Sequence, residues 1–312
     1  MNGAESFNLY IELYMKVANA PCSWGILEFG LDGETDSYSK VLDEMKSTDY
    51  RGTELGDWGF LPTDPLQLKK ELEDRSLKLV GAFVPVNFVN EKEHELGIDE
   101  TLKIARLLQK VDPDNAKIVL SDENGKSRNR TLNAGRIQSS HGLSASGWKT
   151  FAAGVEKAAE RILNETGLKS VFHHHCAGYV ETPAEIETLL DLTNPDYVSL
   201  CFDTGHYAFG GGDPIKGIKT FSDRIDHVHF KDWDRSIFQE TEKNNWDYFE
   251  AVGKGIFCEL GKGSIDFQSV KNELNKQSYS DWIVVEQDIL PGMGEPKESA
   301  RRNREFLKSI GL

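Results

Sequence analysis

The stretch VSLCFDTGH (residues 198–206) decides the fold class, because a short apolar run ends directly in an acidic residue, Asp203. Two later stretches repeat the pattern: RIDHVHFKDWD (224–234) carries His229, and WIVVEQD (282–288) carries Glu286. An earlier run, SVFHHHC (170–176), carries three consecutive histidines. Sites built from the carboxyl ends of successive strands are typical of a (β/α)₈ barrel. The recurrence therefore predicts a TIM barrel with a polar site at that end of its strands.

Eight short β-rich runs alternate with longer amphipathic stretches, as in βα units around a parallel sheet. The candidate strands are Val17–Pro21, Gly52–Leu55, Lys78–Pro85, Lys117–Leu120, Lys169–His173, Tyr197–Phe202, Ile225–Phe230 and Trp282–Glu286. The candidate helices lie at about 36–49, 65–76, 97–112, 147–166, 182–193, 214–222, 266–276 and 297–310. No linker-like composition divides them, so we expect one closed barrel over residues 16–312, preceded by an extension at 1–15. A doubly wound open sheet is the alternative, but eight near-equal units favour closure.

Two longer stretches interrupt this alternation. Residues 121–146 are polar and rich in Gly and Ser, and residues 233–264 follow the seventh strand. Both would emerge at the carboxyl ends of the strands, where lids and substrate-shaping loops belong. For residues 121–146, a disordered surface loop is the equal alternative.

The composition argues against several classes of partner. The 36 Lys and Arg against 51 Asp and Glu give a net charge of −15, which repels a phosphate polyanion and disfavours nucleic acid as a partner. No apolar run approaches the roughly 18 residues that span a bilayer, and the N-terminus lacks the basic start and apolar core of a signal peptide. The four cysteines are widely spaced, without a CxxC pair, so we expect reduced thiols in a cytoplasmic protein.

The polar residues near the strand ends are the candidate functional groups. Alternation points His227, His229 and Lys231 to one face, and burying them unpaired against the helices would be costly, so we expect them in the barrel lumen. Glu286 ends a run too apolar for a surface strand, and a buried carboxylate needs a cation or donors to stay ionised. Asp203 alone is more simply explained as a turn cap. Together, however, Asp, Glu and neutral His suit a divalent cation of intermediate hardness, which indicates a metal-dependent enzyme.

Eight segments resemble the xylose-isomerase-like sugar isomerase/epimerase superfamily, over residues 17–311. They are APCSWG (20–25), GTELGDWGFLPTDP (52–65), LVGAFVPV (79–86), FHHHCAGYVETPAEI (172–186), CFDTGHYAFGGGDP (201–214), RIDHVHFKDWD (224–234), GKGSIDF (261–267) and VVEQD (284–288). The DTGH, HVHFKD and GKGSIDF elements are similar to the superfamily as a whole. By contrast, GTELGDWGFLPTD and FHHHCAGYVET resemble its inosose dehydratase branch.

The resemblance implies a (β/α)₈ barrel that binds a divalent ion, with Mn²⁺ or Co²⁺ favoured and Zn²⁺ or Mg²⁺ as alternatives. Three of the superfamily's ligands map to Asp203, His229 and Glu286. The usual first ligand is a Glu that ends the fifth strand, and this sequence has His173 there instead. Either His173 replaces that carboxylate, which we favour, or Glu181 folds in from the following loop.

The implied ion would chelate a ketone and its neighbouring hydroxyl, acidify the carbon between them and stabilise an enediolate. Expelling a β-hydroxyl completes a dehydration, whereas returning the proton elsewhere gives an epimerisation or isomerisation. The candidate general acids and bases are Lys231, His175, Glu54 and His206, with ion pairing the alternative for Lys231 and a hydrogen bond to the loop at Trp58 the alternative for Glu54. The candidate substrate-binding residues are Trp24, Trp58 and His227, and packing at the barrel mouth is the alternative for both tryptophans.

We therefore expect a lyase that dehydrates 2-keto-myo-inositol or a similar keto-cyclitol. The first alternative is an isomerase or epimerase acting on a ketose or its derivative, on the same fold and ion. An endonuclease for damaged DNA of the same superfamily is disfavoured by the charge, and a non-catalytic sugar-binding barrel would have no use for the ligand set. The expected partner is a small polyol or keto-sugar, not a nucleic acid or a membrane, and the superfamily suggests a homodimer.

Overall fold

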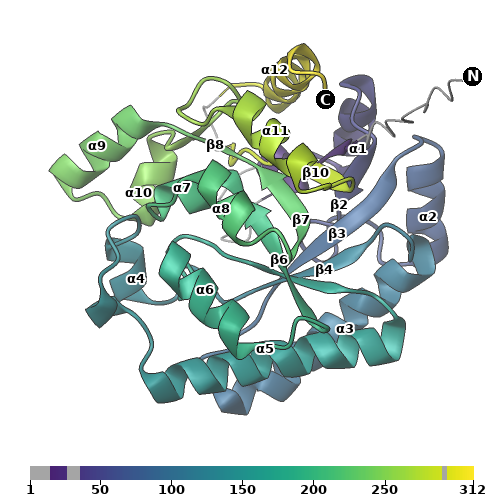
Figure 1. The fold of residues 1–312 in the computed structure, drawn as a ribbon. Coiled ribbons are helices and arrows are strands. Elements are labelled where there is room, and N and C mark those ends of the chain that lie inside the picture. Colours follow the sequence, from purple (N-terminus) through teal and green to yellow (C-terminus); the bar gives the residue numbers. More distant parts are fainter. Residues whose placement is uncertain (1–14, 27–35, 290–293) are drawn as a thin grey trace, which may run out of the picture.

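Eight parallel strands close into a barrel in the computed structural model, which describes residues 15–26, 36–289 and 294–312 (Figure 1). The strands follow the chain order around the barrel, and β1 closes it by pairing with β10. Their bounds are β1 Lys16–Asn19, β2 Gly52–Glu54, β3 Lys78–Pro85, β4 Lys117–Ser121, β5 Ser170–His173, β6 Val198–Asp203, β7 Ile225–Phe230 and β10 Trp282–Val285. The predicted TIM barrel is confirmed. The extension expected at 1–15 lies outside the described residues except for Met15, which is buried.

Helices that alternate with the strands form the outer ring. They are α1 Tyr38–Ser47, α2 Pro65–Glu73, α3 His94–Val111, α5 Ala145–Thr166, α6 Pro183–Leu192, α8 Pro214–Thr220, α11 Phe267–Lys276 and α12 Pro296–Ser309. The eight predicted helices are all present, with ends shifted by a few residues. The Thr182 hydroxyl accepts a hydrogen bond from Glu185 N in a capping box ahead of Pro183, as the sequence indicated. None of the described helices is both long and apolar enough to cross a bilayer.

Alternate residues of each strand divide between two layers of core. On β4, Ile118 and Leu120 pack into the large cluster between strands and helices. Val119, between them, packs with Val171 and Cys201 in a separate small cluster. A second small cluster contains Ala18, Ala20, Val80, Trp282 and Val284. These small clusters fill the lumen, so the polar residues further along the strands lie above an apolar floor.

Proline ends the first strand earlier than predicted. The predicted strand runs to Pro21, but β1 ends at Asn19 and Pro21 begins the 3₁₀ helix η1 (Pro21–Trp24). Proline lacks an N–H to donate to a neighbouring strand, and its fixed φ suits the first position of a helix.

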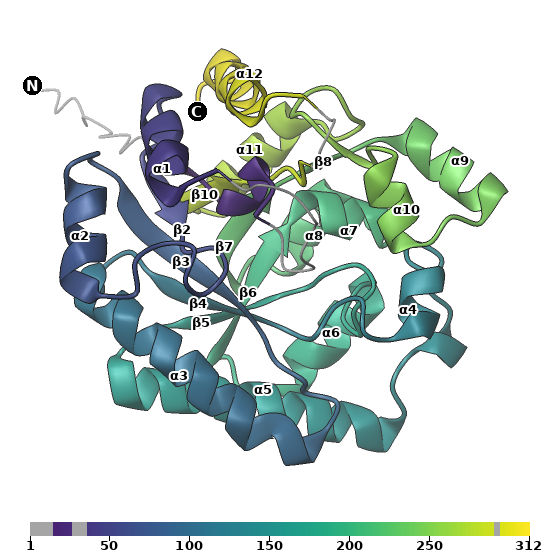
Figure 2. The ribbon, with the colours of Figure 1, turned by 180° about the vertical axis from the view of Figure 1, so that it is seen from behind.

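The two interrupting segments are structured and lie side by side on one flank of the barrel (Figures 1 and 2). The first holds α4 and η3, and Arg136 within it donates to the carbonyls of Thr241 and Trp246 in the second. Their elements are α4 Arg128–Leu132, η3 Ser139–His141, α9 Arg235–Asn244, α10 Tyr248–Gly253, and the antiparallel strands β8 Asp232–Trp233 and β9 Phe257–Cys258. The alternative of a disordered loop at 121–146 is therefore wrong.

Arg130 of α4 anchors the first segment to the loop after β5. Its buried guanidinium donates to both carboxylate oxygens of Glu185, at 2.7 and 2.8 Å, and to Gly178 O at 2.6 Å. Arg130→Met would leave the carboxylate of Glu185 without its paired cation. We expect this change to lower the free energy of unfolding by about 3–5 kcal/mol, the usual cost of breaking a buried ion pair from one side.

Urea denaturation of wild type and variant would measure the loss. Arg161→Met is the matched control, since Arg161 pairs with Glu165 on the helix surface, where an ion pair contributes little. Equal losses in the two variants would contradict an anchoring role for Arg130.

Candidate metal centre and active site

Four strands bring the predicted ligands together at the carboxyl end of the lumen. His173 ends β5, Asp203 ends β6, His229 lies in β7 and Glu286 directly follows β10. Asp203 and His229 are register partners, so they lie at one level of the barrel. One potential ligand atom from each of the four residues lies within 4.8 Å of those of the other three. The four residues lie at the same end of the barrel, as the sequence predicted.

The separations of these atoms suit a shared cation. His229 Nδ1 lies 3.4 Å from Glu286 Oε1 and 3.8 Å from Asp203 Oδ2. His173 Nε2 lies 3.7 Å from Asp203 Oδ2. Ligand atoms that share an ion at about 2.0–2.2 Å lie roughly 3–3.6 Å from one another. Within the described part of the chain, Asp203 Oδ2 and His229 Nδ1 are buried without a hydrogen-bond partner, which is costly unless a cation satisfies them.

Asp203 is also a helix cap, through its other oxygen. Its Oδ1 accepts a hydrogen bond from His206 N at 2.7 Å and so begins the short helix α7 (Thr204–Phe209). This bond leaves Oδ2 to face the other candidate ligands. A Cβ at Gly205 would lie 2.7 Å from Lys231 Cγ, so the glycine of the DTGH motif permits the close approach of α7 to the chain after β7. The Asp203 side chain therefore caps α7 through Oδ1 and is a candidate ligand through Oδ2.

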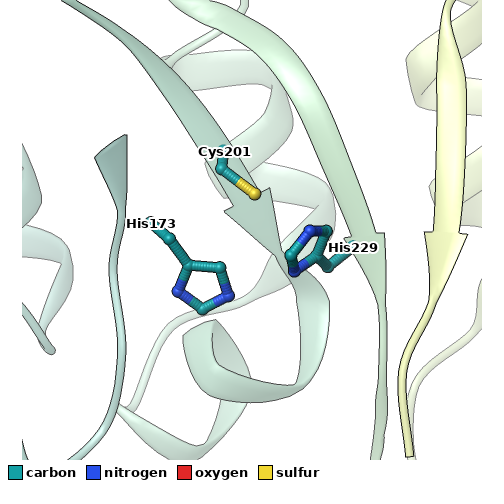
Figure 3. A group of neighbouring side chains, drawn as sticks. All are labelled: His173, Cys201 and His229. Atoms are coloured by element: carbon teal, nitrogen blue, oxygen red, sulfur yellow. The ribbon is translucent and has the colours of Figure 1, made fainter. Parts of the chain in front are cut away.

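A competing group combines the two imidazoles with the thiol of Cys201. The rings of His173 and His229 lie on either side of the β6 strand that carries Cys201 (Figure 3), with their centroids 4.9 Å apart. Burial raises the pKa of Cys201 to about 12, so forming the thiolate here is costly. Because cysteine ligates metals as a thiolate, the carboxylate-containing group is the better candidate.

Glu181 does not reach this centre. Its carboxylate accepts hydrogen bonds from Gly135 N at 2.7 Å and Ala177 N at 2.8 Å, and it lies 3.9 Å from Arg130. Oε1 thus ties the loop after β5 to the segment 121–146, while Oε2 accepts a hydrogen bond within that loop. The alternative in which Glu181 supplies the fourth ligand is therefore wrong, and His173 is the candidate on the fifth strand.

A pocket opens beside the four residues, and its lining includes one protonated side chain and one neutral side chain. It is lined by Ala20, Pro21, Cys22, Ile26, Glu54, Gly56, Asp57, Phe83, His173, His175, Lys231, Glu286 and Asp288. Burial opposes the charge on Lys231, but Asp288 and Glu286, each 3.3 Å from Nζ, keep its pKa well above the usual value. Burial, with His173 and Lys231 nearby, lowers the pKa of His175 to about 3, so its ring is neutral. The pocket is therefore lined by one group that can donate a proton, Lys231, and one that can accept a proton, His175.

Asp288 was not among the site residues predicted from the sequence. Its side chain is buried, lines the pocket and pairs with Lys231. The signal was present in VVEQD, where Asp288 follows Glu286 by two residues, the spacing that places extended residues on one face.

The remaining candidate acid/base residues lie around the pocket. His206 is buried behind the pocket, and its Nε2 lies 3.2 Å from Lys231 Nζ. The ring centroids of His206 and His175 lie 3.8 Å apart. Glu54 lines the pocket, but Oε1 faces His227 and His229 rather than the loop at Trp58. The alternative role of Glu54, a hydrogen bond to that loop, is therefore wrong.

The three predicted substrate-binding residues do not line the pocket among the described residues. Trp24 is buried in the core and its indole N–H donates to Glu44 Oε2 at 2.8 Å. Trp58 is partly exposed, with Lys103 Nζ 4.5 Å above its ring. His227 is fully buried and faces Glu54 across the lumen. Core packing accounts for Trp24, and His227 lies in the lumen as predicted, although it does not line the pocket.

The comparisons with known proteins agree with this architecture. Residues 42–310 match the family model of the xylose isomerase-like TIM barrel. An inosose dehydratase of Lacticaseibacillus casei (strain BL23) is 31% identical over 297 residues, which cover 95% of this chain and 96% of that protein. An inosose dehydratase of Bacillus cereus (strain AH820) is 31% identical over 96% of this chain and 98% of its own length.

Solved structures share the fold at lower identity. The 3-keto-D-glucoside 4-epimerase YcjR from E. coli superposes with a TM-score of 0.68 at 16% identity, covering 95% of this chain and 99% of that one. The IOLI protein, solved with a bound zinc atom, superposes with a TM-score of 0.65 at 17% identity, covering 95% and 98%.

Fold and site together define an enzyme of the xylose isomerase-like TIM barrel class. Within that class, the chain belongs to the inosose dehydratase family, as its resemblance in sequence indicated.

Proposed function

We propose that the protein is a metal-dependent hydro-lyase that removes water from 2-keto-myo-inositol or a closely similar keto-cyclitol in the cytoplasm. The observation that carries this proposal is the convergence of two imidazoles and two carboxylates, with unpaired acceptor atoms, beside a pocket that holds Lys231 and His175. The family relationship supports the hydro-lyase class and the substrate. The zinc atom in the related fold of the IOLI protein supports the use of a divalent ion.

The proposed ion is held by His173, Asp203, His229 and Glu286, with Mn²⁺ or Co²⁺ as the expected native metal. The mixture of nitrogen and oxygen donors suits these ions and Zn²⁺ better than a pure oxygen set would. When bound, the ion would polarise the substrate ketone and stabilise the negative charge that develops as the neighbouring carbon loses its proton.

His175 is the proposed general base. Its Nδ1–H donates to Cys176 O at 2.6 Å, because a carbonyl can only accept. In a neutral ring this bond leaves the lone pair on Nε2. The residue lines the pocket, so Nε2 can take the proton from the substrate carbon and leave an enediolate.

Lys231 is the proposed general acid. Its ammonium is held between Glu286 and Asp288 and lines the same pocket. As the electrons of the enediolate expel the β-hydroxyl, a proton from Nζ converts that hydroxyl into water. His206 lies against the ammonium on its buried side, with Nε2 3.2 Å from Nζ.

The apolar wall of the pocket would favour a ring over an open polyol chain. Phe83 and Ile26 line it together with Pro21. The ring of Phe83 also meets His173 edge-on, with centroids 5.9 Å apart, and so limits the movement of that imidazole. A cyclitol presents axial C–H groups to such a wall while its hydroxyls face the polar side.

Removal of the ion tests the proposal directly. Protein loaded with Mn²⁺ should convert 2-keto-myo-inositol to a dione, which is followed by its ultraviolet absorbance. Chelation should reduce the rate by at least ~10³-fold, since the ion supplies several kcal/mol of transition-state stabilisation. Adding Mn²⁺ or Co²⁺ back should restore it.

Two outcomes would contradict the proposal. Turnover of a ketose without a change in absorbance would indicate an isomerase or epimerase. Full dehydration by protein that elemental analysis shows to be metal-free would exclude the proposed role of the ion.

A further inference from the structure

One carboxylate oxygen on β2 faces two imidazoles on β7, across the lumen. Glu54 Oε1 lies 2.8 Å from His227 Nε2 and 3.0 Å from His229 Nε2. Glu54 is 2% exposed and both imidazoles are fully buried. The three side chains therefore interact without competition from bulk water.

These contacts determine which ring nitrogens carry protons. An ionised carboxylate has only acceptors, so each Nε2 must donate its N–H to Oε1. In a neutral imidazole, a proton on Nε2 leaves the lone pair on Nδ1. In His229, this Nδ1 is the atom that lies 3.4 Å from Glu286 Oε1 and has no hydrogen-bond partner among the described residues. Glu54 thus orients the lone pair of His229 toward the other candidate ligands.

The backbone makes room for this arrangement. The register of the β2–β3 pair shifts between Thr53 and Glu54, an irregularity that re-aims the side chain that follows. A Cβ on Gly81 of β3 would lie 2.9 Å from Glu54 Oε1, so a larger residue there would displace the carboxylate. The strand irregularity and Gly81 both allow the Glu54 carboxylate to point into the lumen.

We propose that Glu54 is a positioning residue for the metal centre and not the general base of the reaction. It holds the proton on His229 Nε2 so that Nδ1 binds the divalent ion, while His227 supplies a second donor that keeps Oε1 occupied. The inference rests on the proposed function for the presence of the ion, and it deepens that function by assigning Glu54 to the support of a ligand.

Metal affinity, measured without any substrate, is the deciding readout. In Glu54→Gln the neutral amide is a weaker acceptor with nearly the same shape. We expect its affinity for Zn²⁺ or Co²⁺, measured by competition with a chromophoric chelator, to fall about 10–100-fold, as is usual when the partner of a ligating imidazole is lost. At saturating metal, kcat should return close to the wild-type value.

Glu44→Gln is the matched control. Glu44 also accepts a ring N–H, from Trp24 at 2.8 Å, but it lies outside the pocket lining. Its substitution should leave the metal affinity unchanged. A Glu54→Gln protein with unchanged affinity and with kcat reduced about 10²–10⁴-fold at saturating metal would identify a general base and overturn the inference.

Nitrogen NMR of the wild-type protein gives a second readout, independent of whether the variant folds. In ¹⁵N-histidine-labelled protein loaded with Zn²⁺, His229 should show a protonated Nε2 and a metal-shifted Nδ1. The opposite assignment would overturn the inference. Metal binding without any dehydration would contradict the proposed function, while the affinity ratio and the NMR assignment would still decide the role of Glu54.

Discussion

Asp203→Asn is expected to abolish tight metal binding and to lower the dehydration rate by at least ~10³-fold. Asn can still accept the hydrogen bond from His206 N through one oxygen, so the start of α7 is preserved. The change replaces only Oδ2, the buried oxygen that lies 3.7 Å from His173 Nε2 and 3.8 Å from His229 Nδ1. An amide group at this position has no negative charge to hold a cation and turns N–H donors toward the ion. The dehydration rate should fall this far because loss of the ion removes several kcal/mol of transition-state stabilisation.

The measurement pairs metal content, by elemental analysis, with the rate of absorbance change on 2-keto-myo-inositol. Asp213→Asn is the matched control, because Asp213 caps α8 with Oδ1 in the same way but lies outside the pocket beside the four candidate ligands. The control should keep both metal and activity. A fully active Asp203→Asn protein would exclude the proposed centre.

Lys231→Met is expected to reduce kcat by about 10²–10⁴-fold, the usual contribution of a general acid. Methionine keeps much of the length of the side chain but cannot donate a proton to the leaving hydroxyl. The variant also leaves Asp288 and Glu286 without their cation, and breaking such a buried pair from one side destabilises a protein by about 3–5 kcal/mol. Rates must therefore be expressed per folded molecule.

Lys117→Met separates catalysis from stability. Lys117 is also buried and pairs with Asp281, but it begins β4, at the opposite end of the barrel from the site. Both variants should unfold at lower urea concentration than the wild type, while only Lys231→Met should lose kcat per folded molecule. If Lys231→Met retained full kcat, the Lys231 ammonium would only form ion pairs with Glu286 and Asp288, and another residue would have to be the general acid.

Features that depend on neighbours in the chain were predicted well. The alternation of short apolar runs with amphipathic stretches predicted eight strands and eight helices, because both periodicities are local properties of the sequence. The Thr182 cap and the lumen face of His227 and His229 follow from the same local rules. The boundary of β1 was missed because Pro21, read as the end of a strand, begins a helical turn instead.

Contacts between distant segments were not predictable in the same way. Nothing near Glu181 in the sequence shows that Gly135 N and Ala177 N occupy its carboxylate. Trp24 lies in a loop-like segment, yet its ring packs in the core and its indole N–H donates to Glu44 on α1. Residues 121–146 look like a polar loop, and their order depends on Arg130 and Arg136, whose partners lie in other segments.

The sequence by itself determined the (β/α)₈ barrel and the end of it that carries the polar residues, because strand period, helix caps and strand-end residue types are encoded within short windows. Only the tertiary structure decided that His173 rather than Glu181 joins Asp203, His229 and Glu286. It also showed that Glu54 faces β7 and that Asp288 holds Lys231. The physical reason is barrel closure: pairing β1 with β10 and staggering the strands sets which side chains meet across the lumen, and no local pattern contains that register.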